Sequence, residues 1–365
     1  MLSTPKISVV MSAYNAAAYL DEAVSSILHQ TFRDFEFIII NNGSTDDTGA
    51  MLDKYRRQDS RIRVYYHEQQ GLARALNAAC GMARGQYIAL MDADDVSLAH
   101  RLARQTAFME NHPQIGIVGT WISKLKNGSV TRNWCPSTSP KMLKWSLFFG
   151  ICVSTPSIMM RRDIVSRLTC PLRSELLHAE DVDLWFRASK ITEFGCVSEV
   201  LYQYRVWPGS STQLHLQIVR ETHVRLLASF IKDFLESDPS MEAVAGLRQT
   251  RIGTPFKNLG QIRSTAALIQ KLHDRFLREN SMTFEERREI SWDAAKRIGS
   301  LALQASRFAA RDFLSLSMRA VKLDYRLIHP SAIMKGLERR RAFNFATQAM
   351  TRGEEELDSR CARSR

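Results

Sequence analysis

The 365-residue chain contains no long uninterrupted apolar stretch. A membrane-spanning helix needs about 20 consecutive apolar residues, and the best candidate, residues 146–160, is interrupted by a Ser-Thr-Pro-Ser run at 154–157. The N-terminus also lacks the apolar core and cleavage site of a secretory signal, because Pro5 and Lys6 lead directly into a strand-like segment. The sequence therefore predicts a cytoplasmic protein that does not span a bilayer.

Cysteine is scarce and scattered. The cysteines stand singly, with no pair at the spacing of a metal site or a redox motif. The dense framework of small disulfide-stabilised secreted domains is missing as well. We therefore expect reduced thiols at Cys80, Cys135, Cys152, Cys170, Cys196 and Cys361.

Glycine is missing where a dinucleotide-binding enzyme would need it. Residues 14–18, after the first predicted strand, read Tyr-Asn-Ala-Ala-Ala. A nicotinamide-dependent oxidoreductase has a glycine-rich loop at this point, which lets the backbone approach a pyrophosphate. Its absence argues against that enzyme class.

Positive charge, in contrast, is present in excess. The formal net charge is +12, and about +9 of it falls after residue 212. Such a surface suits anionic lipid head groups or nucleic acid, and it can also be simply a solvated basic face. No recognisable nucleic-acid-binding module accompanies it, so we expect no nucleic-acid partner.

The first hundred residues alternate between strand and helix patterns. Short apolar runs rich in β-branched residues predict strands at residues 7–11, 35–40, 62–66 and 87–91. Apolar residues at helical spacing predict helices at residues 19–28, 48–55 and 71–83. This alternation implies a mainly parallel sheet covered on both faces, which binds ligands at the carboxyl ends of its strands.

The rest of the chain changes character after residue 212. Before it, a helix is predicted at 98–110 and strands at 115–121, 157–160 and 194–204. After it, amphipathic patterns predict helices at residues 214–235, 266–277, 284–306 and 308–321. We therefore expect an α/β domain over residues 1–212 and an α-helical region with the basic excess over 213–365.

Two acidic groups carry the clearest chemistry. Asp92, Asp94 and Asp95 follow the fourth predicted strand, and their hard oxygen ligands suit Mg²⁺ or Mn²⁺, although a solvated turn has the same composition. Glu180 and Asp181 begin an apolar helical run. A carboxylate there is placed either to remove a proton from a hydroxyl or merely to favour the helix N-terminus.

The loops after the first two predicted strands add an aromatic ring and amides. Tyr14 can stack on a nucleobase while Asn42 bonds to its edge, although Asn and Gly are common in any turn. Together with Gly71, Arg74, Asn77 and residues 83–89, these motifs closely resemble those of family 2 glycosyltransferases over about residues 6–212. The resemblance implies a GT-A fold, a mainly parallel sheet flanked by helices, to which the C-terminal helical region is added.

The resemblance also implies an inverting transfer, in which an acceptor hydroxyl displaces a nucleoside diphosphate in one step. By position, the nucleotide-sugar donor contacts Ser12, Tyr14, Asn42, Arg74, Asp92 and Asp94. The metal, Mg²⁺ or Mn²⁺, is assigned to Asp95 and Asp94, and catalysis to Asp181 as the base with Glu180 beside it. The expected donor is UDP-linked, and the expected acceptor is a glycan or lipid-linked hydroxyl in cell-surface polysaccharide synthesis.

Three features depart from the family pattern. Asn41 and Asn42 stand where an Asp pair is usual, which leaves the nucleobase open, and Trp207 stands where nonprocessive members often carry His. The Gln-x-x-Arg-Trp signature of processive polymerases is absent, which favours transfer of a single sugar. The alternative function is a catalytically inactive nucleotide-sugar or nucleic-acid binding protein, although the full set of carboxylates argues against lost activity.

The resemblance does not extend to the C-terminal helices. Their amphipathic character and the arginine run at 339–341 suit peripheral docking on an anionic inner membrane face, where lipid-linked acceptors lie. A self-packed domain or a dimer interface is equally compatible with the pattern. Residues 352–365 have the composition of a mobile tail.

Overall fold

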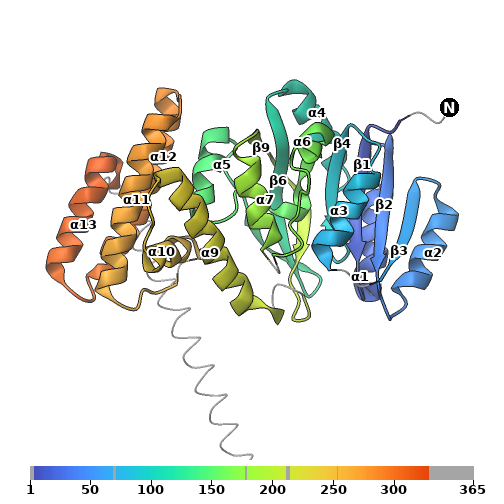
Figure 1. Ribbon diagram of the computed structural model, residues 1–365, viewed down its shortest axis with the longest axis horizontal. Helices are drawn as coiled ribbons and strands as arrows, with labels where there is room; N and C mark the ends of the chain where they lie inside the picture. Colours follow the sequence, from blue (N-terminus) through green and yellow to red (C-terminus); the bar gives the residue numbers. More distant parts are fainter. Residues whose placement is uncertain (1–3, 69–70, 177–178, 211–213, 253, 329–365) are drawn as a thin grey trace, which may run out of the picture. The chain divides into compact units, whose positions relative to one another are not determined.

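The computed structural model describes residues 4–68, 71–176, 179–210, 214–252 and 254–328. Within these ranges a nine-stranded mixed sheet has the strand order β3-β2-β1-β4-β8-β6-β9-β5, with β7 paired to β6 (Figure 1). The strands are β1 (Ile7–Ala13), β2 (Phe35–Asn42), β3 (Ile62–His67), β4 (Tyr87–Asp92), β5 (Val96–Ser97), β6 (Ile115–Lys126), β7 (Ser129–Trp134), β8 (Met159–Arg161) and β9 (Glu193–Arg205).

The N-terminal half of the sheet is parallel. β1 pairs in parallel with β2 and with β4, and β2 pairs in parallel with β3. The helices α1 (Ala17–Leu28), α2 (Thr48–Gln58) and α3 (Leu72–Met82) connect these strands. The alternation predicted from the sequence is confirmed, and so is the mainly parallel sheet that the resemblance implied.

The other half of the sheet is mixed. β6 is parallel to β9, whereas β8 is antiparallel to both β4 and β6. The prediction of a strand from residue 157 was wrong by two residues, because Thr155–Ser157 form a 3₁₀ turn around Pro156, which has no N–H to donate to a ladder. The sequence analysis missed β7, whose side chains are almost all exposed and therefore show no apolar alternation.

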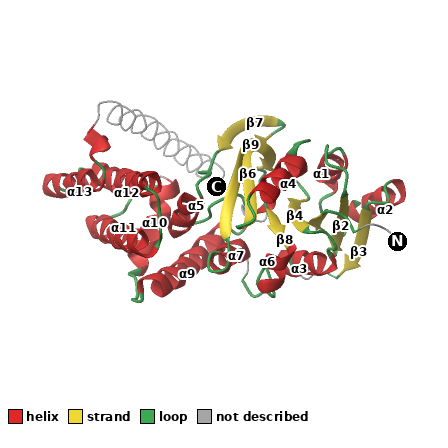
Figure 2. Ribbon diagram, turned by 90° about the horizontal axis from the view of Figure 1, so that it is seen from above, coloured by secondary structure: helices red, strands yellow, loops and turns green. Residues whose placement is uncertain are grey.

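Helices cover both faces of the sheet. α1, α2 and α4 (Arg101–Asn111) lie on one face, and α3, α6 (Arg162–Arg167) and α7 (Glu180–Ala188) lie on the other (Figure 2). Leu20, Val24 and Ile27 of α1 belong to the same fully buried cluster as Val9 and Met11 of β1. Each such side chain contributes about 1.5 to 3 kcal/mol to folding, so this layer fixes where the ends of the strands lie.

The later part of the chain is helical. The helices are α9 (Leu216–Leu235), α10 (Met241–Ile252), α11 (Leu259–Glu279), α12 (Phe284–Ala305) and α13 (Ala310–Leu323). Four of them were predicted, and α10 was not. By internal contacts the structure divides into two compact units, Met1–Val244 and a second that begins at Ala245. The boundary placed after residue 212 stays a prediction.

In the second unit, α12 packs against both α11 and α13. A capping box formed by Thr283 and Glu286 starts α12, and its buried face includes Ile290, Ile298 and Leu301. None of the helices within the described ranges is long and apolar enough to cross a membrane. The arginine run at 339–341 and residues 352–365 lie outside the described residues.

A buried carboxylate joins the amino ends of β1 and β2 to the loop before β4. Glu36 accepts hydrogen bonds from the Ser8 hydroxyl (2.7 Å), the Arg84 backbone N–H (2.8 Å) and the guanidinium of Arg63 (2.6 Å). Burial alone would raise the pKa of Glu36, but these hydrogen bonds outweigh it and hold the pKa below its usual value. The charge is therefore part of the fold at neutral pH.

We predict that Glu36→Ala lowers the free energy of unfolding by about 2 to 4 kcal/mol, because it leaves two arginines and a buried hydroxyl without their shared partner. Urea denaturation measures the loss. The matched control is Glu110→Ala, which breaks a surface ion pair with Lys6 of similar length (2.7 Å) and should cost less than about 1 kcal/mol. Equal losses for the two variants would contradict this account of Glu36.

Candidate active site

The carboxyl ends of β1, β2 and β4 meet at one edge of the sheet. Ser12 of β1 pairs with Asp92 of β4, and the next residue, Ala13, pairs with Asn41 of β2. The polar loops that follow these strands therefore begin side by side, as the sequence analysis expected. Ser12 and Asp92 come from segments 80 residues apart but occupy the same level of the sheet.

The loops after β1 and β2 hold each other in place. The Asn15 backbone N–H donates to the Ser44 hydroxyl (3.1 Å), and the Asn15 side-chain oxygen accepts from the Thr45 N–H (2.9 Å). The Asn41 side-chain oxygen accepts from the Ser44 N–H (3.1 Å), so this amide organises the turn. Tyr14 stands at the rim with 45% of its surface exposed, whereas Asn42 is buried at the end of β2.

The predicted donor residue Arg74 lies in the first turn of α3, where its side chain is exposed. Among the described residues, no hydrogen bond or ion pair joins Arg74 to the acidic cluster. Asn77, one turn later, has a structural role, because its amide bonds to both the N–H (3.1 Å) and the carbonyl (2.6 Å) of Leu172. This exchange ties α3 to the segment that precedes α7.

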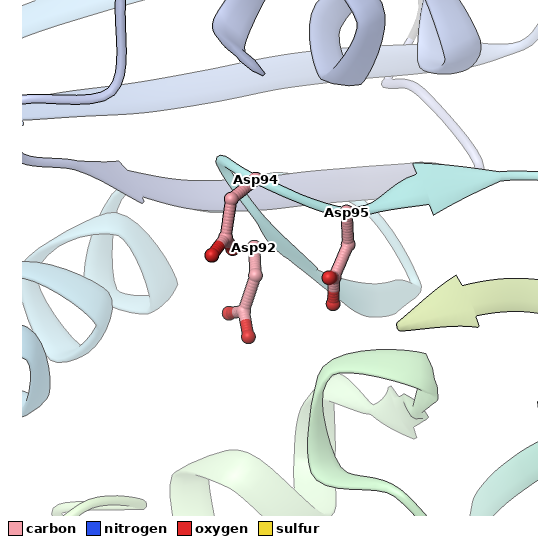
Figure 3. A group of neighbouring side chains, drawn as sticks. All are labelled: Asp92, Asp94 and Asp95. Carbon is pink, nitrogen blue, oxygen red and sulfur yellow. The ribbon is translucent and has the colours of Figure 1, made fainter. Parts of the chain in front are cut away.

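The three aspartates after β4 form one cluster. Carboxylate oxygens of Asp92, Asp94 and Asp95 all lie within 4.8 Å of one another, and the side chains point to the same side of the loop (Figure 3). Asp92 and Asp94 are partly buried, and Asp95 is only 1% exposed. The sequence Asp-Ala-Asp-Asp thus brings three carboxylates together where little of their surface is exposed to solvent.

Two buried side chains beneath the cluster moderate this charge. Arg101 is fully buried, donates to the Leu90 carbonyl (2.7 Å), and lies with its guanidinium 5.0 Å from the centre of the Tyr202 ring. Burial lowers the pKa of Arg101 to about 10, so it stays charged at neutral pH. The Tyr202 hydroxyl accepts a hydrogen bond from the Asp92 backbone N–H (3.3 Å).

The end of β9 holds the acidic loop from the side. The Arg205 backbone N–H donates to Asp95 Oδ1 (2.7 Å), and its Nε donates to the Asp94 carbonyl (2.6 Å). The same guanidinium pairs with Glu22 and lies over the Tyr19 ring, both on α1. Arg205 therefore joins three elements that are distant in sequence.

Burial and the crowding of like charge both raise pKa values in the cluster. Burial, followed by the charges of Asp94, Glu180 and Asp181, raises the pKa of Asp92 to about 7, and Arg101 counteracts part of the rise. Burial and the charges of its two neighbours also raise the pKa of Asp95 well above the usual range. Because Glu180 and Asp181 act on Asp92, the two predicted acidic groups lie within electrostatic reach of each other.

The second acidic group sits at the start of α7. Thr155 accepts a hydrogen bond from the Trp185 indole N–H (3.1 Å) and donates its own hydrogen to Asp181 Oδ2 (3.4 Å). The Val182 N–H donates to Asp181 Oδ1 (2.8 Å). Burial raises the pKa of Glu180 to about 7. Asp181 is thus an oriented acceptor, and Glu180 is partly protonated at neutral pH.

Asp183, the third carboxylate of α7, has a structural role. Asp183 is buried and forms an ion pair with Arg187 (2.6 Å), whose guanidinium also donates to the Pro171 carbonyl (2.7 Å). Asp183 therefore fixes the segment before α7 and does not belong to the site.

The donor atoms of the aspartate cluster fit a divalent cation. Asp95 Oδ2 is buried without a hydrogen-bond partner among the described residues, which is costly for a carboxylate oxygen. A hard cation such as Mg²⁺ or Mn²⁺ would satisfy that oxygen and cancel the repulsion. Asp94 and Asp95, with Asp92 beside them, are the residues that would hold it.

The sequence analysis missed the residues that support the site. One local feature of the sequence could have identified Arg101, because it is a charged residue on the apolar face of a predicted helix, next to Leu102. No local feature could have identified Tyr202 or Arg205, because they reach the cluster only through the pairing of β9 with β5 and β6. Only the folded sheet brings them within range of residues 92–95.

We predict that the metal-free protein loses stability as the pH rises. The pKa values of Asp92 and Glu180, about 7, lie above the unfolded values of about 4. The unfolded chain therefore binds fewer protons than the folded one between these values, so the free energy of unfolding falls as pH increases through this window. Thermal unfolding in EDTA should show a lower midpoint at pH 8 than at pH 5, and Mn²⁺ should restore the midpoint at pH 8.

The Asp92→Asn variant isolates the cause. It removes one of the crowded charges, so its midpoint should fall less between pH 5 and pH 8 than that of the wild type. Asp163→Asn, an exposed change on α6, serves as the control and should follow the wild type. An equally steep fall in Asp92→Asn would show that the cluster does not govern the pH dependence.

Comparison with known proteins agrees with this geometry. Residues 8–169 match the model of glycosyl transferase family 2. The chain is 32% identical over 212 residues to MJ1057, an uncharacterized glycosyltransferase of Methanocaldococcus jannaschii, covering 56% of this chain and 72% of the relative. It is also 32% identical over 231 residues to WbnJ, an O-antigen biosynthesis glycosyltransferase of Escherichia coli, covering 62% of this chain and 89% of the relative.

Solved structures with low sequence identity share the fold. Residues 1–349 of TarS from S. aureus in complex with UDP-GlcNAc superimpose with a TM-score of 0.54 at 18% identity, covering 88% of this chain and 91% of TarS 1–349. The mannosyltransferase PcManGT from Pyrobaculum calidifontis, in complex with GDP-Man and Mn²⁺, gives a TM-score of 0.50 at 15% identity, covering 90% and 88% of the two chains. With the sequence relatives, these matches show that the chain is a GT-A enzyme that belongs to glycosyltransferase family 2.

Proposed function

We propose that this glycosyltransferase transfers a single sugar, with inversion, from a UDP-linked donor to a hydroxyl of a glycan or a lipid-linked acceptor. The main observation behind the proposal is that two acidic groups lie close to each other at one edge of the sheet. The metal-type cluster at 92–95 and the oriented carboxylate of Asp181 lie near enough for the charge of one to raise the pKa of the other. A displacement reaction needs a stabilised leaving group and a base on opposite sides of the reacting carbon.

The donor nucleotide is assigned to the loops after β1 and β2. The exposed ring of Tyr14 offers a surface on which a base can stack, and Asn42 closes the neighbouring strand. Ser12 lies between them and Asp92 at the same level of the sheet. Structures of two proteins with this fold contain UDP-GlcNAc and GDP-Man, which supports a nucleotide sugar as the ligand.

The diphosphate is assigned to the aspartate cluster. When bound, Mg²⁺ or Mn²⁺ supplies Lewis-acid chemistry that neutralises the charge of the departing diphosphate. Asp94 and Asp95 would hold the cation, Asp94 would also contact the ribose, and Asp92 would complete the donor side. Arg74, exposed at the start of α3, adds a positive charge on the donor side.

The acceptor hydroxyl is assigned to α7. Asp181 removes its proton, and the hydrogen bonds from Thr155 and Val182 orient the carboxylate for this transfer. Glu180, with a pKa of about 7, carries a proton part of the time and donates a hydrogen bond to the acceptor. Two adjacent carboxyl groups thus divide into a base and a positioning group.

The names of relatives support a role in polysaccharide synthesis. WbnJ acts in O-antigen biosynthesis, and EpsE and EpsH of Bacillus subtilis are putative glycosyltransferases similar to this chain. We therefore propose a role in cell-surface polysaccharide synthesis. The alternative, an inactive nucleotide-sugar binding protein, is disfavoured because the carboxylates of both acidic groups are present and organised.

We predict that one nucleotide sugar in a panel of UDP-, GDP- and dTDP-sugars is turned over with Mn²⁺ or Mg²⁺ and not with EDTA. Asp181→Asn should lower kcat by about a hundredfold to ten-thousandfold, the range for removing a general base, while donor affinity stays within about threefold. Asp95→Asn should weaken donor binding as well as turnover. Radiolabelled sugar transfer and calorimetric binding of UDP measure the two effects.

The control for this experiment is Asp163→Asn, which should retain wild-type turnover. UDP binding without transfer by the wild type, with every acceptor class offered, would favour the inactive binding protein. If no nucleotide binds at all, the proposed function is wrong.

We further propose that the second unit contacts an anionic membrane surface. Arg311, Leu314, Met318 and Lys322 recur at helical spacing along α13 and are exposed, so they form one apolar stripe with basic ends. The opposite face of α13 is buried through Leu316 and Ala320. An exposed apolar stripe on a chain with a net charge of +12 suits lipids with negative head groups.

We predict that the protein floats with vesicles containing phosphatidylglycerol and not with pure phosphatidylcholine vesicles. The double substitution Leu314→Glu and Met318→Glu should weaken binding about tenfold, through lost apolar contact and added repulsion. Glu285→Gln and Glu289→Gln on α12, which change charge without touching the stripe, should not weaken it. Equal binding to the phosphatidylglycerol vesicles and to the pure phosphatidylcholine vesicles would contradict the proposal.

A further inference from the structure

The segment after β9 contacts a partly exposed carboxylate of the cluster. Trp207 donates its indole N–H to Asp94 Oδ2 at 2.7 Å. Asp95 is buried and anchored by the Arg205 N–H, whereas the Asp94 side chain is partly exposed. The Asp94 backbone is already fixed by Arg205 through its carbonyl. The Arg205 contact with Asp94 does not involve its carboxylate, and the indole bonds to that group.

The indole itself is held on two sides. Its ring packs against Tyr19 of α1, with ring centres 5.3 Å apart, and Tyr19 also lies under the Arg205 guanidinium. On the other side, a Cβ at Gly209 would come within 2.1 Å of Trp207 Cζ3, so the absence of a side chain at 209 makes room for the ring. A rigid aromatic donor on a crowded support has few alternative orientations, which suits it to fixing a partner.

We propose that Trp207 is a positioning residue that orients the Asp94 carboxylate for the divalent cation and the donor. The inference rests on the proposed function, because it presumes that Asp94 contacts a metal-bound nucleotide sugar. A carboxylate has two oxygens and about four acceptor positions, so one indole N–H on Oδ2 leaves capacity for a cation. Partners that orient a metal ligand commonly change metal affinity by about ten- to a hundredfold when they are removed.

In a competing account, Trp207 hinders the binding of the cation. In that account the indole occupies the oxygen that a cation needs, so removing the N–H would strengthen metal binding. The two accounts predict opposite changes for the same substitution. A measurement of cation affinity on the free enzyme therefore decides between them without any turnover.

The test compares Mn²⁺ binding by three variants of the 365-residue chain. Electron paramagnetic resonance measures the binding. Trp207→Phe keeps an aromatic ring and deletes the donor, and it should weaken Mn²⁺ binding about tenfold. Trp207→His keeps a ring N–H at the corresponding position and should stay within about threefold of the wild type. Trp121→Phe is the matched control, because Trp121 also donates its indole N–H (3.0 Å), but to the carbonyl of Pro136, which follows β7.

A second readout needs no metal. In the ¹⁵N spectrum of the tryptophan side chains, the Trp207 N–H signal, assigned by its loss in Trp207→Phe, should shift in Asp94→Ala and not in Asp163→Asn. An unshifted signal would show that the hydrogen bond is absent in solution and would overturn the inference.

The Mn²⁺ measurements separate the remaining outcomes. Unchanged or tighter Mn²⁺ binding in Trp207→Phe, or binding by Trp207→His as weak as that of Trp207→Phe, overturns the inference and leaves the proposed metal site intact. A wild type that binds no Mn²⁺, with or without UDP, overturns the proposed metal site and the inference together. Weakened binding in Trp207→Phe alone, with Trp207→His and Trp121→Phe like the wild type, supports the role of Trp207.

Discussion

The repulsion among Asp92, Asp94 and Asp95 is the constraint on which the site depends. Three carboxylates within 4.8 Å, one of them fully buried, oppose folding whenever all are ionised and no cation is present. Burial first, and then the charges of the neighbouring carboxylates, raise the pKa values of Asp92 and Asp95. A fold that nevertheless keeps the cluster together must hold the acidic loop with contacts strong enough to resist it, and a ligand that removes the repulsion gains affinity in return.

Those contacts come from α4, β9 and α1. Arg101 on α4 supplies a buried positive charge from below, and Tyr202 on β9 meets the backbone of Asp92. Arg205, at the end of the same strand, ties the loop to α1 through Glu22. Hydrogen bonds and two buried arginines, Arg101 and Arg205, thus fix the loop, and Asp95 Oδ2 is left without a hydrogen-bond partner among the described residues.

Much of this could be predicted from the sequence, and the limit has a physical cause. The β-α alternation set the parallel half of the sheet, and the rule that ligands bind at carboxyl strand ends placed Ser12, Asn42 and Asp92 together. Contacts that depend on strand pairing across more than a hundred residues, such as Arg205 with Asp95, have no local signal. Composition also fails to separate Asp181 from Asp183, because helix geometry alone turns one toward Thr155 and the other toward Arg187.

The contacts that support the acidic loop extend beyond the part of the chain that matches the family model. The family match stops at residue 169, yet the oriented carboxylate of Asp181 and the supports Tyr202 and Arg205 lie beyond it. β9 also pairs along most of β6, so the strand that holds the acidic loop is part of the central sheet. A fragment cut after residue 169 would retain the three aspartates and Arg101, and it would lose the contacts that Tyr202 and Arg205 make with the acidic loop. The site is therefore a property of the whole sheet through β9, even though its most recognisable residues lie within the first hundred.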